Sequence, residues 1–228
     1  MSRAPSRWMV CAAGLLAGLA VYLLAGCGDT PPPPAASAAP TVADTRAVVL
    51  FLGDSLTAGY GLSSDEAFPA LIQQRIDDAG LTYRVVNAGV SGDTSAGGVR
   101  RIDWLLKLPV AVLVVELGAN DMLRGQDPDN LHRNLAQIID RTRAAHPDAR
   151  FVIAGMRAVP NLGAAYAKPF EAVFPELARG AGAALIPFLL DGVAGDPSLN
   201  LPDGIHPTAA GHRIIADTVW DVLAPELR

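Results

Sequence analysis

Cysteine is nearly absent from this chain of 228 residues, because Cys11 and Cys27 are the only two and both lie near the N-terminus. Beyond residue 27 the sequence offers no disulfide framework and no thiolate cage for a metal ion. It also excludes a cysteine nucleophile from the rest of the chain. The folded part must work with hydroxyl, imidazole, carboxyl and amide groups.

An excess of positive charge is missing as well. The chain has 18 Lys and Arg against 23 Asp and Glu, a formal net charge of −5. Two of the arginines, Arg3 and Arg7, stand in an N-terminal stretch without acidic residues, so the remainder is more acidic still. Binding to nucleic acid normally needs a basic face. We therefore expect no nucleic-acid partner.

Hydrophobic residues make up 50% of the chain and charged residues 18%. This composition is far from that of disordered proteins and supplies enough apolar material for a sizeable core. About 200 residues after a removable leader correspond to one domain rather than two. No internal repeat is present.

The N-terminus reads as an export signal. Arg3 and Arg7 precede an uncharged apolar stretch at 8–25, which is typical of a secretory signal and long enough to cross a bilayer. It ends in Leu-Ala-Gly-Cys, which resembles the bacterial lipobox. That resemblance implies a signal peptide at 1–26 and a lipid on Cys27. The alternative is an uncleaved signal anchor with a chance cysteine.

A short linker follows the predicted lipidation site. Residues 27–46 contain four consecutive prolines and an Ala/Ser/Pro/Thr mixture, which favours extended polyproline geometry and buries nothing. In lipoproteins, Asp directly after the cysteine tends to retain the protein in the inner membrane, and here Gly28 occupies that position. We expect a lipid-anchored protein of the bacterial envelope, in the outer membrane and facing the periplasm.

From residue 47 onward, short apolar runs alternate with amphipathic stretches. Runs rich in Val, Leu and Ile predict strands buried on both faces, at 48–52, 84–87, 110–117, 151–154 and 184–186. Apolar residues at helical spacing lie between or after them, at 68–76, 131–142 and 214–223. This alternation predicts a three-layer α/β sandwich with a parallel sheet.

Unusual polar residues follow the predicted strands. In open parallel sheets, ligands bind on the loops beyond the carboxyl ends of the strands. Here those loops hold Gly-Asp-Ser-Leu at 53–56, Asn-Ala-Gly-Val-Ser-Gly-Asp at 87–93 and Gly-Ala-Asn-Asp at 118–121. A fourth cluster, Asp-Gly-Ile-His-Pro at 203–207, precedes the last helix. The fold as predicted brings the four together.

Three of these residues suit nucleophilic catalysis. The hydroxyl of Ser55 needs a base to take its proton, and His206 is the plausible base at a loop end. Asp203 stands three residues before His206, close enough to orient the imidazole through Nδ1 and leave Nε2 for Ser55. Alone, Ser55 could be a helix N-cap, and Asp203 with His206 could bind a divalent metal, although a third and fourth ligand are missing.

Acyl transfer also requires hydrogen-bond donors aimed at the developing oxyanion. The candidates are the backbone N–H groups of Ser55 and Gly89 and the side-chain amide of Asn120. Gly89 and Asn120 could instead be a turn glycine and a loop-bonding amide. We interpret Asp54 as structural, fixing the turn before Ser55 through its carboxylate.

The four clusters, in this order, resemble the motif blocks of the SGNH (GDSL) hydrolases. The segments 52–60, 87–95, 114–121 with 123–125, and 203–207 are similar to the branch that includes bacterial thioesterase I, lysophospholipase L1 and arylesterases. The Gly-x-Ser-x-Gly elbow of other α/β-hydrolases is absent, because Thr57 takes its last position. The similarity runs from about residue 48 to the C-terminus.

The resemblance implies a flavodoxin-like sandwich with about five parallel strands in a hydrolase domain at 47–228. It implies Ser55 as nucleophile, Asp203 and His206 as the other triad members, and Ser55, Gly89 and Asn120 as the oxyanion hole. The expected reaction is hydrolysis of esters or thioesters of lipophilic acyl groups through an acyl-Ser55 intermediate, without metal or cofactor. The alternatives are a carbohydrate O-acetylesterase and a non-catalytic lipoprotein that binds acyl lipids.

The remaining predictions concern single residues. We expect His132, His146 and His212 at the surface and Trp104 and Trp220 in the core. Met122 and Leu123 could line an acyl groove or simply pack. A loop at 160–169 with Tyr166 could border the pocket. The sequence does not predict an oligomeric state.

Overall fold

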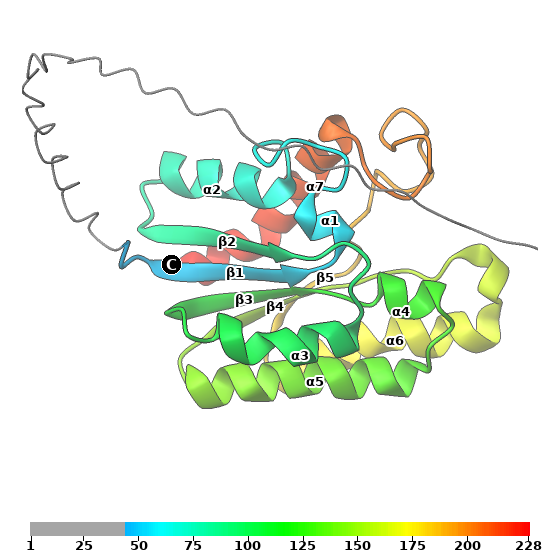
Figure 1. The fold of residues 1–228 in the computed structure, drawn as a ribbon, viewed down its shortest axis with the longest axis horizontal. Helices are drawn as coiled ribbons and strands as arrows, with labels where there is room; N and C mark the ends of the chain where they lie inside the picture. Colours follow the sequence, from blue (N-terminus) through cyan, green and yellow to red (C-terminus); the bar gives the residue numbers. More distant parts are fainter. Residues whose placement is uncertain (1–43) are drawn as a thin grey trace, which may run out of the picture. The chain divides into compact units, whose positions relative to one another are not determined.

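The computed structural model describes residues 44–228; the predicted signal peptide, Cys27 and most of the linker lie outside the described residues. Five parallel strands form one sheet in the order β2-β1-β3-β4-β5 (Figure 1). The strands are β1 (Ala47–Gly53), β2 (Tyr83–Gly89), β3 (Val110–Glu116), β4 (Arg150–Ala154) and β5 (Ala184–Ile186). The three-layer α/β prediction is confirmed, and the predicted strands differ from these bounds by at most two residues at either end.

Helices cover both faces of the sheet (Figure 1). One face carries α2 (Phe68–Asp78) and α7 (Ala209–Leu223), and the other carries α3 (Ser95–Leu105), α5 (Pro128–Ala145) and α6 (Ala164–Ala181). Four shorter elements complete the described chain: α1 (Ser55–Ala58), α4 (Ala119–Leu123) and the 3₁₀ turns η1 (Pro160–Leu162) and η2 (Ala224–Leu227).

The central strands are apolar because both of their faces are covered. Residues 48–52 of β1 are completely buried, and β3 is nearly so along its length. A strand in this position gains from burying every side chain, so its sequence is a continuous run of Val, Leu and Phe instead of an alternating pattern. This explains why β1 and β3 are readily recognised in the sequence.

The strand register places the candidate site at the carboxyl ends of the parallel strands. Gly53, the last residue of β1, pairs with Gly89 of β2 on one side and with Glu116 of β3 on the other. The three strands therefore end level, and the loops that follow them meet at the same edge. β1 begins at Ala47, at the opposite, amino ends of the strands.

The predicted loop at 160–169 is wrong in its second half. Helix α6 begins at Ala164 and contains Pro169 and Pro175. The prolines favour a break, but Phe170, Val173, Phe174 and Leu177 are buried at helical spacing against the rest of the core. Burial of this apolar stripe outweighs the local preference of proline.

Two single-residue predictions are also wrong. Trp104 on α3 is 70% exposed instead of lying in the core, whereas His212 on α7 is only 1% exposed. The imidazole Nδ1 of His212 accepts a hydrogen bond from the backbone N–H of Phe68 at 3.1 Å, which satisfies the ring inside the core. Trp220, His132 and His146 are each partly buried.

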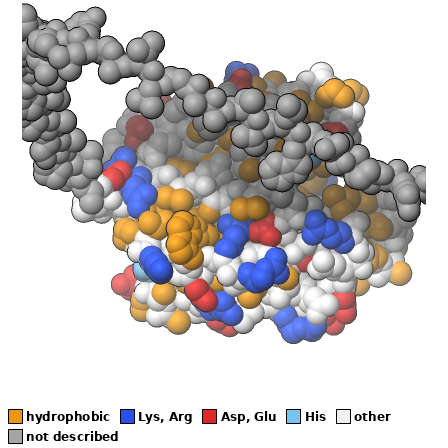
Figure 2. All heavy atoms as spheres, in the orientation of Figure 1, with side chains coloured by type: hydrophobic (Ala, Val, Ile, Leu, Met, Phe, Trp, Pro, Cys, Tyr) orange, Lys and Arg blue, Asp and Glu red, His pale blue; other side chains and the backbone are white. Residues whose placement is uncertain are grey.

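The surface of the described chain is mixed in character. On the face drawn in Figure 2, basic, acidic and hydrophobic side chains are interspersed. Among residues 44–228, no helix has the length and apolar character needed to cross a bilayer.

Candidate active site

Ser55 is displayed by a sharp turn at the end of β1. It is the first residue of α1, whose N-cap is Asp54, and the Asp54 Oδ1 accepts a hydrogen bond from Leu56 N at 3.0 Å. The turn depends on glycine, because a Cβ on Gly53 would lie 2.0 Å from the Thr57 Oγ1 and 2.6 Å from the Glu116 Oε2. Ser55 itself is partly exposed and open to a substrate.

The structure brings Ser55, His206 and Asp203 together. The Ser55 Oγ lies 2.9 Å from the His206 Nε2, and the His206 Nδ1 lies 2.7 Å from the Asp203 Oδ2. This is the hydrogen-bonded chain in which an imidazole can take a proton from a hydroxyl while a carboxylate fixes its tautomer. The arrangement matches the sequence prediction, although the residues lie 151 positions apart.

The spacing between Asp203 and His206 has a local cause. The Asp203 Oδ1 accepts the backbone N–H groups of Ile205 and His206 at 2.9 and 3.0 Å, while Leu201 N donates to the His206 carbonyl oxygen at 2.7 Å. The backbone N–H and then the side chain of His206 lower the pKa of Asp203 to about 2. The Asp203 carboxylate is therefore ionised at neutral pH.

The segments that carry the motif blocks expose apolar side chains. The ring of Tyr60 packs on the His206 imidazole with 4.4 Å between centroids. Tyr60, Val90, Leu123 and Ile205 are each about half exposed, and each comes from a different one of the four motif segments. Met122, by contrast, is buried, and its sulfur accepts a hydrogen bond from Val159 N. We call the four exposed residues the apolar rim.

Gly89, a predicted oxyanion donor, lies directly against the nucleophile turn. A Cβ on Gly89 would stand 2.2 Å from Ala58 N and 2.8 Å from the carbonyl oxygen of Asp54, so only glycine fits. The N–H of Gly89 donates to the Asn87 Oδ1 at 2.9 Å. An oxyanion at this position would share that N–H or replace the Asn87 oxygen.

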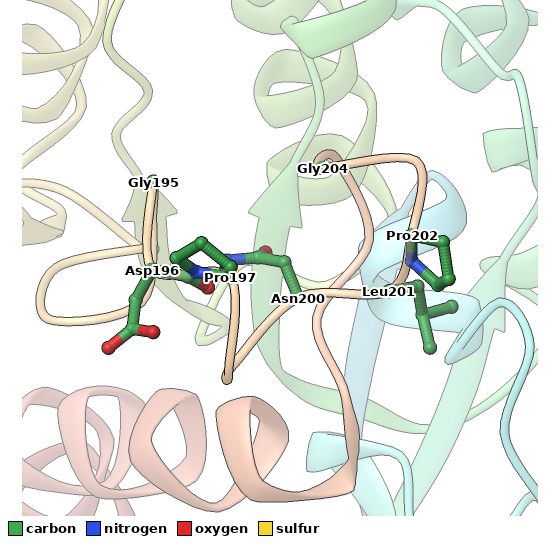
Figure 3. Close-up of a pocket in the computed structure, with 7 residues that line it drawn as sticks. All are labelled: Gly195, Asp196, Pro197, Asn200, Leu201, Pro202 and Gly204. Atoms are coloured by element: carbon green, nitrogen blue, oxygen red, sulfur yellow. Dashed lines mark hydrogen bonds between the residues drawn. The ribbon is translucent and has the colours of Figure 1, made fainter.

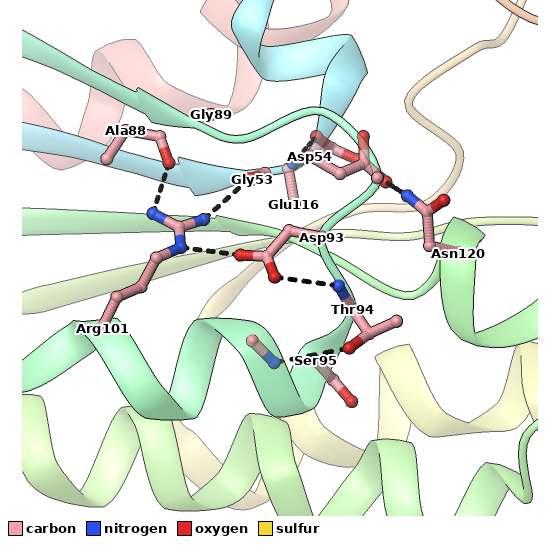
Figure 4. A network of polar contacts seen from close by, with 12 residues as sticks. Gly53, Asp54, Ala88, Gly89, Asp93, Thr94, Ser95, Arg101, Glu116 and Asn120 are labelled. Atoms are coloured by element: carbon pink, nitrogen blue, oxygen red, sulfur yellow. Dashed lines mark hydrogen bonds and ion pairs between the residues drawn. The ribbon is translucent and has the colours of Figure 1, made fainter. Parts of the chain in front are cut away.

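Asn120, the predicted side-chain donor to the oxyanion, lies near the start of α4. Its Nδ2 donates to the Asp54 Oδ2 at 3.0 Å, which leaves the second N–H of the amide for another acceptor (Figure 4). The interpretation of Asp54 as a structural residue agrees with these contacts. The carboxylate caps α1 with one oxygen and holds Asn120 with the other.

Arg101 is a supporting residue that sequence reasoning missed. From α3 its guanidinium donates to the carbonyl oxygens of Ala88 and Gly53 at 2.6 and 2.8 Å, and it pairs with the Asp93 carboxylate at 2.7 Å (Figure 4). It thereby ties the ends of β1 and β2 together beside Gly89. An arginine seven residues after a helix N-cap gives no signal of this role without the fold.

A pocket of about 280 Å³ is lined by the segment that connects β5 to α7 (Figure 3). Its lining residues flank Asp203 in the sequence: Gly195, Asp196, Pro197, Asn200, Leu201, Pro202 and Gly204. The Asp196 carboxylate is turned away from the other labelled residues, so the nearby lining is largely backbone and apolar (Figure 3). The pocket borders the site without including Ser55.

Metal ligands are not gathered anywhere in the described part of the chain. Within residues 44–228, no group of three or more His, Cys, Asp or Glu side chains is placed to hold a metal ion.

Comparison with known proteins identifies the family. Residues 51–214 match the GDSL-like Lipase/Acylhydrolase family. Esterase TesA of Pseudomonas aeruginosa is 42% identical over 180 residues, which cover 78% of this chain and 89% of that protein. Thioesterase 1/protease 1/lysophospholipase L1 of Escherichia coli K12 is 40% identical over 179 residues, covering 78% of this chain and 83% of that protein.

Solved structures agree. The crystal structure of TesA superposes with a TM-score of 0.75 at 41% identity, covering 78% of this chain and 99% of that one. The resemblance to SGNH hydrolases and the predicted fold are thus confirmed. The chain belongs to the GDSL-like lipase/acylhydrolase family and is an SGNH-type esterase or thioesterase.

Proposed function

We propose that this chain hydrolyses esters or thioesters of lipophilic acyl groups through an acyl-Ser55 intermediate. The observation that carries the proposal is the hydrogen-bonded chain from the Ser55 Oγ through His206 to Asp203, at 2.9 and 2.7 Å. It lies on a fold whose relatives include an esterase and a thioesterase.

The chemistry follows from this geometry. The His206 Nε2 takes the hydroxyl proton as the Ser55 Oγ attacks the acyl carbonyl carbon. The tetrahedral intermediate then collapses, the bond to the alcohol or thiol breaks, and His206 returns the proton to that leaving group. Water next attacks the acyl-Ser55 ester and gives its proton to His206. The bond between the acyl carbon and the Ser55 Oγ then breaks, and His206 returns the proton to that oxygen. The products are the free acid and a regenerated Ser55.

Three donors are proposed to stabilise the oxyanion of each tetrahedral intermediate: Ser55 N, Gly89 N and the free N–H of the Asn120 amide. They lie at or just beyond the carboxyl ends of β1, β2 and β3, which end level with one another. Each such donor contributes on the order of 10²- to 10³-fold to the rate. Neutral donors also leave the apolar surroundings of the site without an extra charge.

The apolar rim supports a lipophilic acyl group as substrate. Tyr60, Val90, Leu123 and Ile205 expose hydrophobic surface on the four segments that carry the motif blocks, and the Tyr60 ring packs on His206. Contact with an alkyl chain would remove about 0.8 kcal/mol of unfavourable hydration per buried methylene group. An acetyl group on a sugar would leave this surface unused.

Ser55→Ala tests the nucleophile. We expect the wild type to react covalently with a fluorophosphonate probe and to release a burst of p-nitrophenol, and the variant to lose both because it lacks the attacking oxygen. Ser198→Ala is the matched control, since Ser198 is an exposed loop serine bonded to Asp196. Undiminished labelling of the Ser55 variant would refute the assignment.

A panel of substrates tests the acyl preference. We expect kcat/KM for p-nitrophenyl esters to rise from acetyl to medium chains, with acyl-CoA of the same lengths tested alongside. Preference for an acetylated oligosaccharide would instead identify a carbohydrate esterase. The absence of turnover on every substrate would favour a lipid-binding protein.

We further propose that residues 1–26 are removed as a lipoprotein signal peptide and that lipidated Cys27 attaches the enzyme to the outer membrane, facing the periplasm. The support is the basic, apolar and Leu-Ala-Gly-Cys order of the N-terminal sequence. Mass spectrometry of the membrane-extracted protein should find an acylated peptide that begins at Cys27. Recovery of an intact peptide containing Trp8 would contradict cleavage.

A further inference from the structure

Glu116 is a fully buried carboxyl group that the proposed reaction does not use. It ends β3, and its Oε2 accepts hydrogen bonds from the Thr57 Oγ1, Asp54 N and Thr57 N at 2.7, 3.2 and 3.3 Å. Within residues 44–228, no donor reaches the other oxygen, Oε1. A carboxylate needs donors on both oxygens, whereas a carboxylic acid needs them on its carbonyl oxygen alone. The contacts of Glu116 are those of a neutral acid.

The neighbour that can accept the proton of Glu116 is Asp54. The Asp54 N–H donates to the Glu116 Oε2 at 3.2 Å, the two side-chain carboxyl groups interact, and Asp54 is itself 1% exposed. Unlike Glu116, Asp54 has a donor on each oxygen, Leu56 N at 3.0 Å and the Asn120 Nδ2 at 3.0 Å. Those donors favour an ionised Asp54 beside a protonated Glu116.

Electrostatics favours the same distribution of charge. Two buried carboxylates in contact cannot both remain ionised without a large penalty, so one proton is retained between them. Burial, and then the charge of Asp54, raise the pKa of Glu116 well above its usual range. Burial also raises the pKa of Asp54, but the N–H groups of Leu56 and Asn120 and the nearby His206 act against that rise.

We propose that Glu116 is held protonated against the Asp54 carboxylate and that this acid pair positions the Asn120 amide as an oxyanion donor. This role rests on the proposed function, in which Asn120 stabilises the tetrahedral intermediate. Asp54 holds one N–H of the amide and so fixes the direction of the other (Figure 4). Neither carboxyl touches the substrate, so both are positioning residues.

Infrared spectroscopy tests the protonation state independently of activity. At neutral pH we expect the carbonyl stretch of a buried, protonated carboxylic acid in the wild type and in Ser55→Ala, and its loss in Glu116→Gln. Glu176→Gln, at an exposed position of α6, is the control and should retain the band. If the wild type shows no such band, Glu116 is ionised and the proposal is overturned.

A double-mutant cycle tests the route through Asn120. Asp54→Asn turns an NH₂ group towards the Asn120 NH₂ and should lower kcat about 10²-fold while KM stays within about threefold. Asn120→Ala should have a similar effect, and Asp54→Asn should cost little more in that background. A merely structural role of Asp54 would give losses that multiply, and that result would overturn the proposal.

Variants of Glu116 complete the test. Glu116→Leu should lower kcat, and Glu116→Gln, which keeps both a carbonyl oxygen and a donor, should recover most of the loss. If Glu116→Leu does not fold, the infrared band and the cycle at Asp54 remain decisive. Failure of the proposed function has a different signature, because Ser55→Ala would then retain turnover while the infrared band was unaffected.

Discussion

Gly89 shows how little space a single position of this site allows. The nearest atoms to an added Cβ, at 2.2 to 2.8 Å, are backbone atoms of Ala58 and Asp54, which cannot rotate away. Any side chain at residue 89 must therefore push β2 away from the turn that displays Ser55. The tight contact couples the position of one oxyanion donor to that of the nucleophile.

Gly89→Ala should consequently lose activity before it loses the fold. We expect kcat to fall about 10²-fold and the free energy of unfolding to fall by about 1–3 kcal/mol, because overpacking displaces the backbone. Gly180→Ala is the matched control, since open space surrounds that glycine near the end of α6. Steady-state kinetics and urea unfolding would measure both effects, and normal kinetics for Gly89→Ala would contradict the predicted contact.

His212 makes stability depend on pH. Burial lowers its pKa from 6.5 to about 4, so the unfolded chain takes up a proton below pH 6.5 that the folded protein does not accept until about pH 4. The stabilising contribution of neutral His212 to the free energy of unfolding is thus fully present above about pH 6.5 and falls as the pH decreases. Between pH 7 and pH 5 we expect a loss of about 2 kcal/mol from this residue.

The measurement is urea unfolding at several pH values for the wild type and His212→Asn. The Asn oxygen can still accept a hydrogen bond from Phe68 N but does not titrate. The slope of the free energy of unfolding against pH should therefore differ between the two proteins only through the imidazole. Equal slopes would show that His212 is protonated in the folded state.

At the scale of elements, α6 is a helix that forms although it contains two prolines, which disfavour helical structure. Pro169 is exposed on α6, where it lacks the N–H that would bond the preceding turn. A helix-interior proline costs about 3 kcal/mol relative to alanine, and removing it returns about 1 kcal/mol of freedom to the unfolded chain. Pro169→Ala should therefore stabilise the protein by about 1–2 kcal/mol. Thermal unfolding would check it, and a lower Tm would show that the helix has adapted to the proline.

The same contrast explains what the sequence can and cannot predict. β1 and β3 are recognisable because burial on both faces requires continuous apolar runs, and Ser55, Asp203 and His206 because their motifs follow strands or precede a helix. The prediction that Trp104 lies in the core is wrong because its position relative to α5 depends on packing. Glu116 and Arg101 act through partners distant in sequence, so only the register of the strands reveals them.

At the scale of the whole molecule, residues 44–228 contain every strand of the sheet and every residue proposed to act on substrate. A chain beginning at Asp44 should fold and hydrolyse soluble p-nitrophenyl esters with kcat/KM within about twofold of the full-length enzyme, since it keeps the whole core. Circular dichroism and kinetics would test this. An unfolded or inactive product would mean that the preceding residues complete the domain.

Ala47 begins β1 at the amino ends of the strands, whereas Ser55 follows the carboxyl end of the same strand. Coupling through residues before Ala47 therefore attaches the domain at the amino ends of the strands, away from the active-site residues at their carboxyl ends. On a bead or sensor surface derivatised in this way, the apolar rim would face the solution, and captured enzyme would keep its access to dissolved substrate. Attachment through the two lysines, Lys107 and Lys168, would instead give a mixture of orientations.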